Sequence, residues 1–212
     1  MKISYCMLTH NETSSLMELI DFIVEHKDDE DEIVILDDYS DNEDTKKILD
    51  ATVSIYDIKF EQRHLNNDYA SQKNYLKNMC TGDYIFNFDA DELSSNWLVE
   101  NIKEILKLNP EIDLYWVPRI NTVEGLTQEH IQKWGWAVND KKWINFPDYQ
   151  GRIWKNRSNI RWIRPVHERL TGYKEHTYLP EEEQFCFYHY KNINKQEEQN
   201  KKYDKIRGGA DG

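Results

Sequence analysis

The sequence has little of several features that mark common classes of protein. Only 3 of its 212 residues are cysteine, an odd and widely spaced set. That excludes a disulfide framework or a cysteine-based zinc site and predicts buried, reduced thiols. No apolar run approaches the roughly 18 residues of a membrane-spanning helix, and the apolar N-terminus is too short for a secretory signal. We therefore expect a cytoplasmic protein without a membrane span.

Basic residues are also scarce, because 27 Lys and Arg stand against 39 Asp and Glu, for a net charge of −12. Nucleic-acid phosphates and anionic lipids repel such a chain, so we expect no nucleic-acid partner. The charge is uneven: residues 28–44 hold 10 acidic and no basic residues, whereas residues 119–174 hold 11 basic and 5 acidic residues. The second half is therefore suited to an anionic small molecule.

Aromatic residues, in contrast, are plentiful, at 13% of the chain with 7 Trp and 13 Tyr. This content indicates a folded chain despite a mean hydropathy of −0.87. Six of the tryptophans lie beyond Pro110. Those at 134–143 are either a wall of exposed rings for a ligand or the packing core of a small lobe.

The first half alternates short apolar runs with amphipathic segments of helical length. We expect strands at 3–8, 33–36, 53–60 and 83–88, and helices at 13–26, 45–49, 69–79 and 97–108. This alternation predicts an α/β fold, in which helices flank a Rossmann-like, mostly parallel sheet. Shorter strand-like runs follow Pro110, at 114–120, 152–154, 160–163, 166–170 and 185–190. Ligands of such sheets bind beyond the carboxyl ends of the strands.

These patterns divide the chain into three parts. Residues 1–110 form an α/β half, and residues 111–194 form a smaller, aromatic-rich, β-containing half. Residues 195–212 are expected to form a charged helix and a flexible, glycine-rich tail. Such a tail suits a linker, so we expect further C-terminal domains in a longer polypeptide.

The sharpest chemical feature is a pair of carboxylates, Asp89 and Asp91, directly after the apolar run 84–88. Two carboxylates one residue apart can point into one crevice, and their oxygens suit Mg²⁺ or Mn²⁺ while leaving coordination positions for phosphates. A metal held in this way neutralises the charge on a departing diphosphate. The alternative is a solvated turn or a helix cap, since Asp favours both.

Four motifs occur together in one order along residues 3–93. They are Leu8-Thr9-His10-Asn11-Glu12, Ile35-Leu36-Asp37-Asp38-Tyr39-Ser40, Ala70-Ser71-Gln72-Lys73-Asn74, and the segment from Tyr84 to Glu92. In these motifs the chain resembles the family-2 glycosyltransferases. The resemblance implies a GT-A fold, a nucleotide-diphosphate sugar donor, and Mn²⁺ or Mg²⁺ as cofactor. It makes residues 1–110 the donor-binding half and residues 111–194 the acceptor and catalytic half, with the tryptophans at 134–143 as a wall for the acceptor sugar. The size of the chain and its division into halves are also similar to those of small glycosyltransferase domains of chlorella viruses.

The resemblance implies roles at the nucleoside end of the site. Thr9 and Glu12 would contact the nucleoside, and His10 would stack on the base. Asp38 would accept the imide N–H of uracil, a ring proton that cytosine lacks, so UDP is favoured over CDP. An ordinary loop role is the alternative for Thr9.

It also implies roles at the diphosphate end. Lys73 would neutralise phosphate as a point charge, Asp89 would reach the ribose or the sugar, and Asp91, with Asp89, would hold the metal. His167 is a candidate to complete the metal shell or to touch the diphosphate, with a packed histidine as the alternative.

An inverting transfer needs a carboxylate opposite the departing diphosphate, to deprotonate the acceptor hydroxyl. We choose Glu168, which lies between strand-like runs amid basic residues, at a position similar to that in related short transferases. The alternative is a surface salt bridge from Glu168 to Arg164 or Arg169. Asp148 is the next candidate for the base.

The chain departs from the family pattern in two places. Residues 66–69 lack a glycine often found there, and the Q-x-x-R-W element of processive members has Ser158 in place of Gln, although Arg161-Trp162 match. We therefore expect a metal-dependent, non-processive and inverting enzyme. It would move a hexosyl or deoxyhexosyl unit from a UDP-sugar to a hydroxyl of a glycan or glycoprotein acceptor.

Two other classes of function remain open. A nucleotidyltransferase of related fold would ordinarily show a glycine-rich phosphate loop after its first strand, and residues 8–15 contain no glycine. A non-catalytic carbohydrate-binding module would explain the tryptophans but not the acidic residues at the ends of strands.

Overall fold

The computed structural model describes residues 1–194, 196 and 197; apart from these last two, the predicted C-terminal helix and tail at 195–212 lie outside the described residues. The first half consists of β1 (Ile3–Thr9), α1 (Ser14–His26), β2 (Glu32–Asp37), α2 (Glu43–Tyr56), β3 (Lys59–Gln62), α3 (Tyr69–Met79), β4 (Tyr84–Asp89), β5 (Glu92–Ser94) and α4 (Asn96–Leu108). The second half consists of β6 (Leu114–Glu124), α5 (Gln128–Trp134), β7 (Ile144–Lys155), β8 (Arg161–Ile163), β9 (Arg169–Thr171), β10 (His176–Tyr178), the 3₁₀ helix η1 (Glu183–Phe185) and β11 (Phe187–Asn192).

In the described part of the chain, the strands form one large sheet in the order β3-β2-β1-β4-β7-β6-β11-β5, with β10 also paired to β6. Strands β3, β2, β1 and β4 run parallel. Strand β7 is antiparallel to both β4 and β6 and so joins the two halves of the molecule. Strands β8 and β9 form a separate hairpin. The predicted α/β fold with a mostly parallel sheet is confirmed.

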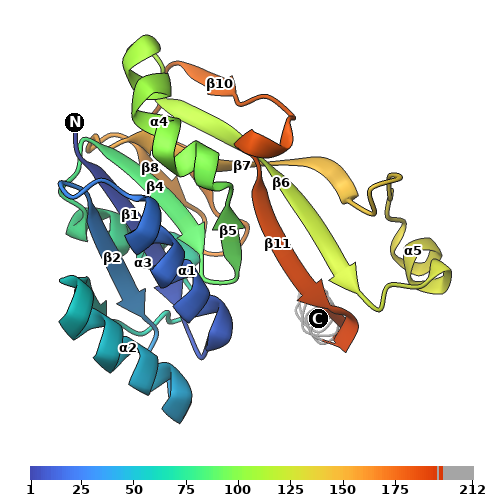
Figure 1. Ribbon diagram of the computed structural model, residues 1–212. Helices are drawn as coiled ribbons and strands as arrows, with labels where there is room; N and C mark the ends of the chain where they lie inside the picture. Colours follow the sequence, from blue (N-terminus) through green and yellow to red (C-terminus); the bar gives the residue numbers. More distant parts are fainter. Residues whose placement is uncertain (195, 198–212) are drawn as a thin grey trace.

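Helices cover both faces of the parallel strands, because alternate strand residues point to opposite faces. On one face, Tyr5 and Phe86 pack with residues of α1 and α4, which lie with α2 in front of the sheet in Figure 1. On the other face, Cys6 packs with Leu76 of α3 and with Trp162 of β8. The three cysteines are free and buried, as predicted.

Two predicted strands differ from the structure. Residues 53–56 belong to α2, and only Lys59–Gln62 form a strand. The β-branched residues of 53–60 suggested a strand. Asn42, however, caps α2 by accepting from the N–H groups of Asp44 and Thr45. The packing of this helix keeps residues 53–56 helical. The predicted strand at 166–170 begins only at Arg169, because residues before it form a loop in which His167 has a positive φ of 55°.

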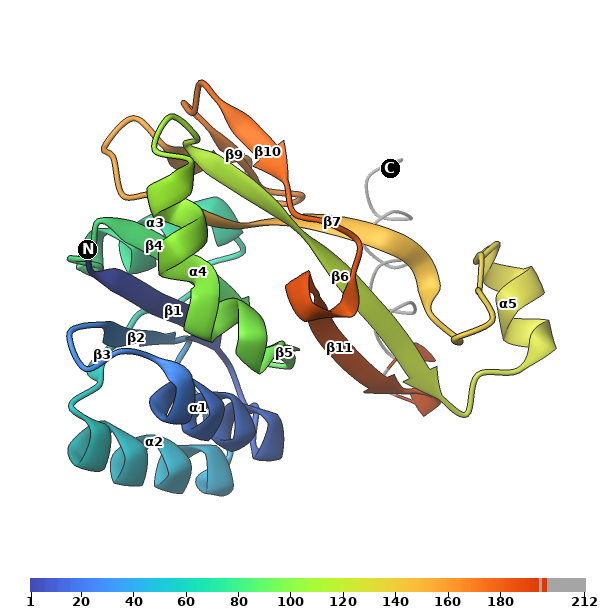
Figure 2. The ribbon, with the colours of Figure 1, turned by 45° about the horizontal axis from the view of Figure 1, so that its top comes forward.

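Part of the second half extends from the body of the protein as an arm. Strands β6 and β7 run beyond β4, with β11 beside the far half of β6, and carry α5 at their far end (Figure 2). Helix α5 contains no buried residue, whereas Trp154 and Trp162 are buried in the body of the protein. The tryptophans therefore divide between the core and the arm. Among the described residues, no helix is both long enough and apolar enough to span a membrane.

Candidate active site

The carboxyl ends of β1, β2 and β4 meet at one edge of the sheet. In the strand register, Thr9 pairs with Asp37 and Leu8 pairs with Asp89, and the N–H of Asp38 donates to the carbonyl oxygen of Thr9 at 2.9 Å. The structure thus brings together Thr9, Asp38 and Asp89 from three separate motifs. The Oγ1 of Thr9 is buried and has no hydrogen-bond partner among the described residues, so it is available to a ligand.

Flat rings surround the carboxylate of Asp38. Its Oδ1 accepts a hydrogen bond from the N–H of Leu65 at 2.8 Å, and the Nδ1 atoms of His10 and His64 lie 4.0 and 3.9 Å from its two oxygens. The ring of Tyr39 lies 4.0 Å from that of His64, centroid to centroid. A carboxylate acceptor among planar side chains suits a nucleobase. Sequence reasoning gave no role to Tyr39 or His64.

Carboxylates and guanidinium groups form a buried network next to this edge. The Nη2 of Arg152 donates to Asp89 Oδ2 at 2.5 Å and to Glu92 Oε1 at 2.7 Å. Arg119 donates through Nη1 to Glu92 at 2.6 Å, and through Nε and Nη2 to Asp148 Oδ2 at 2.9 and 2.6 Å. Asp89 and Asp148, predicted from distant parts of the chain, are thus joined through one set of ion pairs.

The network decides how its carboxylates titrate. Burial by itself would raise the pKa of Asp89, but the charges of Arg152 and Lys73 outweigh it and hold that pKa well below its usual range. Burial likewise opposes ionisation of Asp148, and Arg119 and Asn121 outweigh it and lower the pKa. Both groups are therefore ionised at neutral pH, and Asp148 is a weak base.

A histidine that sequence reasoning missed faces Asp91. The Nε2 of His189 lies 3.4 Å from Asp91 Oδ2, and its Nδ1 lies 3.0 Å from Asn121 Oδ1. Because Asn121 donates through Nδ2 to Asp148 at 2.9 Å, its oxygen is the atom that accepts from His189. The neutral imidazole then carries its proton on Nδ1 and turns the Nε2 lone pair toward Asp91.

Two lone-pair atoms 3.4 Å apart repel unless a proton or a cation lies between them. An imidazole nitrogen beside a carboxylate oxygen, with the other ring nitrogen held by an amide, is a common metal-binding arrangement. The residues present therefore fit a divalent metal. No group of three or more His, Cys, Asp or Glu is arranged to hold a metal in the part of the chain that is described.

The predicted base, Glu168, pairs with Lys73 rather than with Arg164 or Arg169. Lys73 Nζ lies 2.6 Å from Glu168 Oε1 and 4.5 Å from the centre of the Trp162 ring. This pair connects α3 with the loop that precedes β9. It places the predicted base beside the predicted phosphate-binding lysine.

The remaining predicted residues, Glu12, Asp91 and His167, lie in different surroundings. Glu12 and Asp91 line a cavity of about 290 Å³ together with Tyr188 and Tyr190 of β11. His167 lies in the exposed loop before Glu168, so His189 is the histidine that the structure places beside Asp91.

The missed residues had a weak signal in the sequence. Phe187 and His189 lie on the buried side of β11, whereas Tyr190 is exposed. A histidine at a buried position of an alternating strand indicates a polar function within the core. Arg119 gave no comparable signal, because arginines on strands usually face solvent.

Comparison with known proteins agrees with this architecture. The sequence profile described as Glycosyl transferase family 2 matches residues 4–194. The SPbeta prophage-derived glycosyltransferase SunS of Bacillus subtilis (strain 168) and the glycosyltransferase SunS of Bacillus phage SPbeta are each 23% identical over 168 residues, covering 79% of this chain and 34% of theirs. The chain thus spans about a third of the length of these curated relatives.

Solved structures of S. aureus TarS share the fold. One has a TM-score of 0.60 and 16% identity, covering 90% of this chain and 37% of that chain. TarS residues 1–349 in complex with UDP-GlcNAc has a TM-score of 0.58 and 13% identity, covering 90% and 59%. None of these proteins supports a closer likeness to small viral domains of chlorella-virus type. The GT-A-like fold, the gathered strand-end carboxylates and the match over residues 4–194 lead to one conclusion: the chain belongs to glycosyl transferase family 2.

Proposed function

We propose that this chain transfers a hexosyl or deoxyhexosyl unit from a UDP-sugar to a hydroxyl group of a glycan or glycoprotein acceptor, one sugar at a time and with inversion. The observation that carries the proposal is the facing pair of Asp91 and His189, 3.4 Å apart, beside the strand ends. Family membership supports a nucleotide-sugar donor, and the TarS complex with UDP-GlcNAc supports a uridine nucleotide.

The nucleoside is bound at the ends of β1 and β2. Asp38 Oδ2 accepts the imide N–H of uracil, since Oδ1 already accepts from Leu65. His10 and Tyr39 are exposed aromatic rings on which the base stacks. The unpartnered hydroxyl of Thr9 and the carboxylate of Glu12 bind the ribose side of the nucleoside.

Asp91 and His189 would hold Mn²⁺ or Mg²⁺, and so small a set of protein ligands would leave room for the phosphates of the donor. When bound, the metal stabilises the negative charge on the leaving UDP. Asp89 does not need to bind the metal directly, because its Oδ2 is held by Arg152 at 2.5 Å; it orients the ribose or the sugar.

Glu168 acts as the base of the transfer. It takes the proton of the acceptor hydroxyl while that oxygen attacks the anomeric carbon, and the bond from this carbon to the diphosphate oxygen breaks to release UDP. Lys73, paired with Glu168 in the structure, turns to the diphosphate when the donor is bound and supplies a positive charge. Glu168 is then left with a free lone pair for the acceptor.

The family match supports this reading over the two other classes, a nucleotidyltransferase and a carbohydrate-binding module. Three free, buried thiols support a reducing, cytoplasmic compartment. Ser158, in place of the Gln of the processive Q-x-x-R-W element, supports a single-sugar transferase.

Calorimetric titration with UDP, with and without Mn²⁺, tests the proposal. The native protein is expected to bind UDP more tightly with Mn²⁺, and Asp91→Asn is expected to lose about 10-fold to 100-fold of the metal-dependent affinity. His189→Gln should behave like Asp91→Asn, whereas His167→Gln, a histidine of the exposed loop, should bind like the native protein. Metal-dependent binding retained by Asp91→Asn would contradict the metal site, and a native protein that binds no UDP would contradict the donor.

A further inference from the structure

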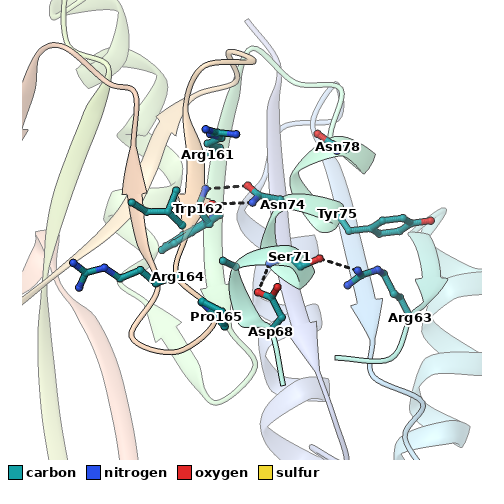
Figure 3. A pocket seen from close by; sticks show the side chains of 12 residues that line it. Arg63, Asp68, Ser71, Asn74, Tyr75, Asn78, Arg161, Trp162, Arg164 and Pro165 are labelled. Carbon is teal, nitrogen blue, oxygen red and sulfur yellow. Dashed lines mark hydrogen bonds between the residues drawn. The ribbon is translucent and has the colours of Figure 1, made fainter. Parts of the chain in front are cut away.

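A groove of about 540 Å³ lies between α3 and the β8–β9 hairpin. None of the residues assigned above to the donor, the metal or the base lines it. Arg63 and Arg164 stand on opposite sides of the groove, with Asn74 and Trp162 between them (Figure 3). It is therefore a hollow separate from the edge of the sheet.

The groove is basic in a protein that carries a net charge of −12. Three arginines line it, against a single carboxylate, that of Asp68. Asp68 is already used, because its Oδ1 caps α3 by accepting from the N–H of Ser71 at 2.9 Å. Arg161 and Arg164 are exposed, and neither side chain has an ion-pair partner in the described part of the chain. Two guanidinium groups thus remain available for an anion.

The third arginine is fixed in place before any ligand arrives. Arg63 donates through Nη1 to Gln72 Oε1 at 2.5 Å and through Nη2 to Ser71 Oγ at 2.8 Å. Its guanidinium carbon lies 5.3 Å from the centre of the Tyr75 ring, and the hydroxyl of Tyr75 donates to Glu61 at 2.6 Å. A guanidinium held in this way loses little freedom when it binds an anion.

We propose that this groove is a second ligand site that takes a phosphate ester with a hydroxylated body, such as a sugar phosphate. Phosphate suits the arginines because each planar guanidinium can donate two parallel hydrogen bonds to its oxygens. The amide of Asn78 and the half-exposed ring of Tyr75 line the same groove, and they suit the polar edge and the face of a sugar ring.

The groove is linked to the active site through one loop. The side chain of Asn74 bonds both the carbonyl and the N–H of Trp162, each at 2.9 Å, and this fastens β8 to α3. The loop after β8 has Arg164 in the groove at one end and Glu168 against Lys73 at the other. A ligand that holds Arg164 therefore restricts the segment that positions Glu168. This link rests on the role proposed above for Glu168.

Binding is tested with glucose 6-phosphate by calorimetry, in the presence of saturating UDP and Mn²⁺ so that the donor site is filled. The native protein is expected to bind, and the double variant Arg161→Gln/Arg164→Gln is expected to bind at least about 10-fold more weakly. Arg169→Gln is the matched control, because Arg169 is an exposed arginine of the same hairpin outside the groove. Absence of binding when UDP is present, or equal binding by the double variant, would overturn the site.

The link to the active site is tested by the rate of UDP release from the donor sugar that gives turnover. Glucose 6-phosphate is expected to change this rate in the native protein and in Arg169→Gln but not in the double variant, if the ligand is a free metabolite. If the phosphate belongs to the acceptor, glucose 6-phosphate instead raises the KM for a phosphorylated glycan. If glucose 6-phosphate changes neither the rate of UDP release nor the KM for a phosphorylated glycan, the link is overturned. No UDP release by the native protein, with glucose 6-phosphate still bound, would count against the proposed function alone.

Discussion

One amide, that of Asn121, orients the ring of the histidine beside Asp91. Asn121 donates to Asp148 at 2.9 Å and accepts from His189 at 3.0 Å, and Asp148 is in turn held by two hydrogen bonds from Arg119. This chain of contacts orients the ring of His189 toward Asp91, where we propose that the metal binds. Asp148, which the sequence offered as an alternative base, is therefore better suited to positioning His189.

At the residue scale, Glu168→Gln separates binding from chemistry. The glutamine oxygen still accepts from Lys73, so the fold and the affinity for UDP with Mn²⁺ should stay within about twofold of the native values. Transfer should fall by about 10²-fold to 10⁴-fold, the usual contribution of a general base. Steady-state transfer and calorimetry on the same samples give the two readouts.

Asp148→Asn provides the comparison for that variant. Loss of its charge frees Asn121 to turn, so UDP binding with Mn²⁺ should weaken along with transfer. Full transfer by Glu168→Gln, together with intact UDP binding and lost transfer in Asp148→Asn, would move the base to Asp148.

The predicted site residues that the structure brings together share one property. Thr9, Asp38 and Asp89 each directly follow or end a strand of the parallel half, where the order of elements along the chain already places them at one edge. His189 lies 98 residues from Asp91 in sequence, and only the pairing of β11 with β5 and β6 brings the two together. Strand pairing over such distances leaves no local pattern to recognise.

At the element scale, the first half shows local sequence signals, whereas the second half depends on strand pairing between distant residues. The cap of α4 was predictable because Ser95 has a local target, the N–H of Leu98 at 3.1 Å. The extent of β7 was not, since residues 144–151 are irregular in hydrophobicity and acquire their strand conformation from pairing with β6. Only the stretch at 152–154, which also reaches β4, was apolar enough to be predicted.

The N-terminal ends of β1 and β2 are held together by one carboxylate. Glu32 accepts from Lys2 Nζ at 2.8 Å, from Ser4 Oγ at 2.5 Å, and from the N–H and Oγ1 of Thr81 at 2.5 and 2.7 Å. Burial alone would raise the pKa of Glu32, but the hydrogen bonds from Lys2, Ser4 and Thr81 outweigh it and lower the pKa to about 2. The ionised form is therefore the one that the fold stabilises.

The lowered pKa of Glu32 predicts how stability depends on pH. Its contribution is fully present above the unfolded-state pKa of about 4.3 and is lost as pH falls toward the folded-state value of about 2. Glu32→Gln should therefore lower the free energy of unfolding by about 2 to 3 kcal/mol at pH 7, and the difference from the native protein should shrink steadily between pH 5 and pH 2. Urea unfolding at several pH values measures this.

Glu43→Gln is the matched control for that series. Glu43 is an exposed glutamate of α2 whose only ion pair in the described part of the chain is to Lys46, three residues along the helix, and such pairs contribute little. A pH-independent difference for Glu32→Gln, or an equal effect of Glu43→Gln, would contradict the assignment.

At the scale of the whole molecule, the net charge of −12 has a partly structural explanation. In the acidic segment 28–44, Lys103 of α4 lies within 2.9 Å of carboxylate oxygens of Asp28, Glu30 and Asp31. These contacts fasten the α1–β2 connection to α4. In the basic second half, Arg119 and Arg152 lie inside the buried network with carboxylates. The two halves thus differ in charge, and the net charge of the whole chain describes neither half.

The arm formed by β6, β7 and α5 is the part of the molecule best placed to meet an acceptor. Trp136 lines a cavity of about 180 Å³ together with Asp148 and His189, and its ring lies 4.6 Å from that of Trp134. Because α5 buries no residue, the far end of the arm adds little to the core. An aromatic ring that shares a cavity with His189 suits the face of an acceptor sugar.

Trp136→Ala should therefore raise the KM for a glycan acceptor by about 5-fold to 10-fold, the equivalent of one lost aromatic contact. UDP release in the absence of acceptor, and the midpoint of thermal unfolding, should barely change, because Trp136 touches neither the donor edge nor the core. Trp143→Ala is the matched control: it removes the same side chain from the same arm, but Trp143 packs on Phe146, with ring centroids 4.7 Å apart, and does not line the cavity. Equal KM values for the native protein and Trp136→Ala, or an equal loss in both variants, would show that the arm's tryptophans pack the lobe rather than bind the acceptor.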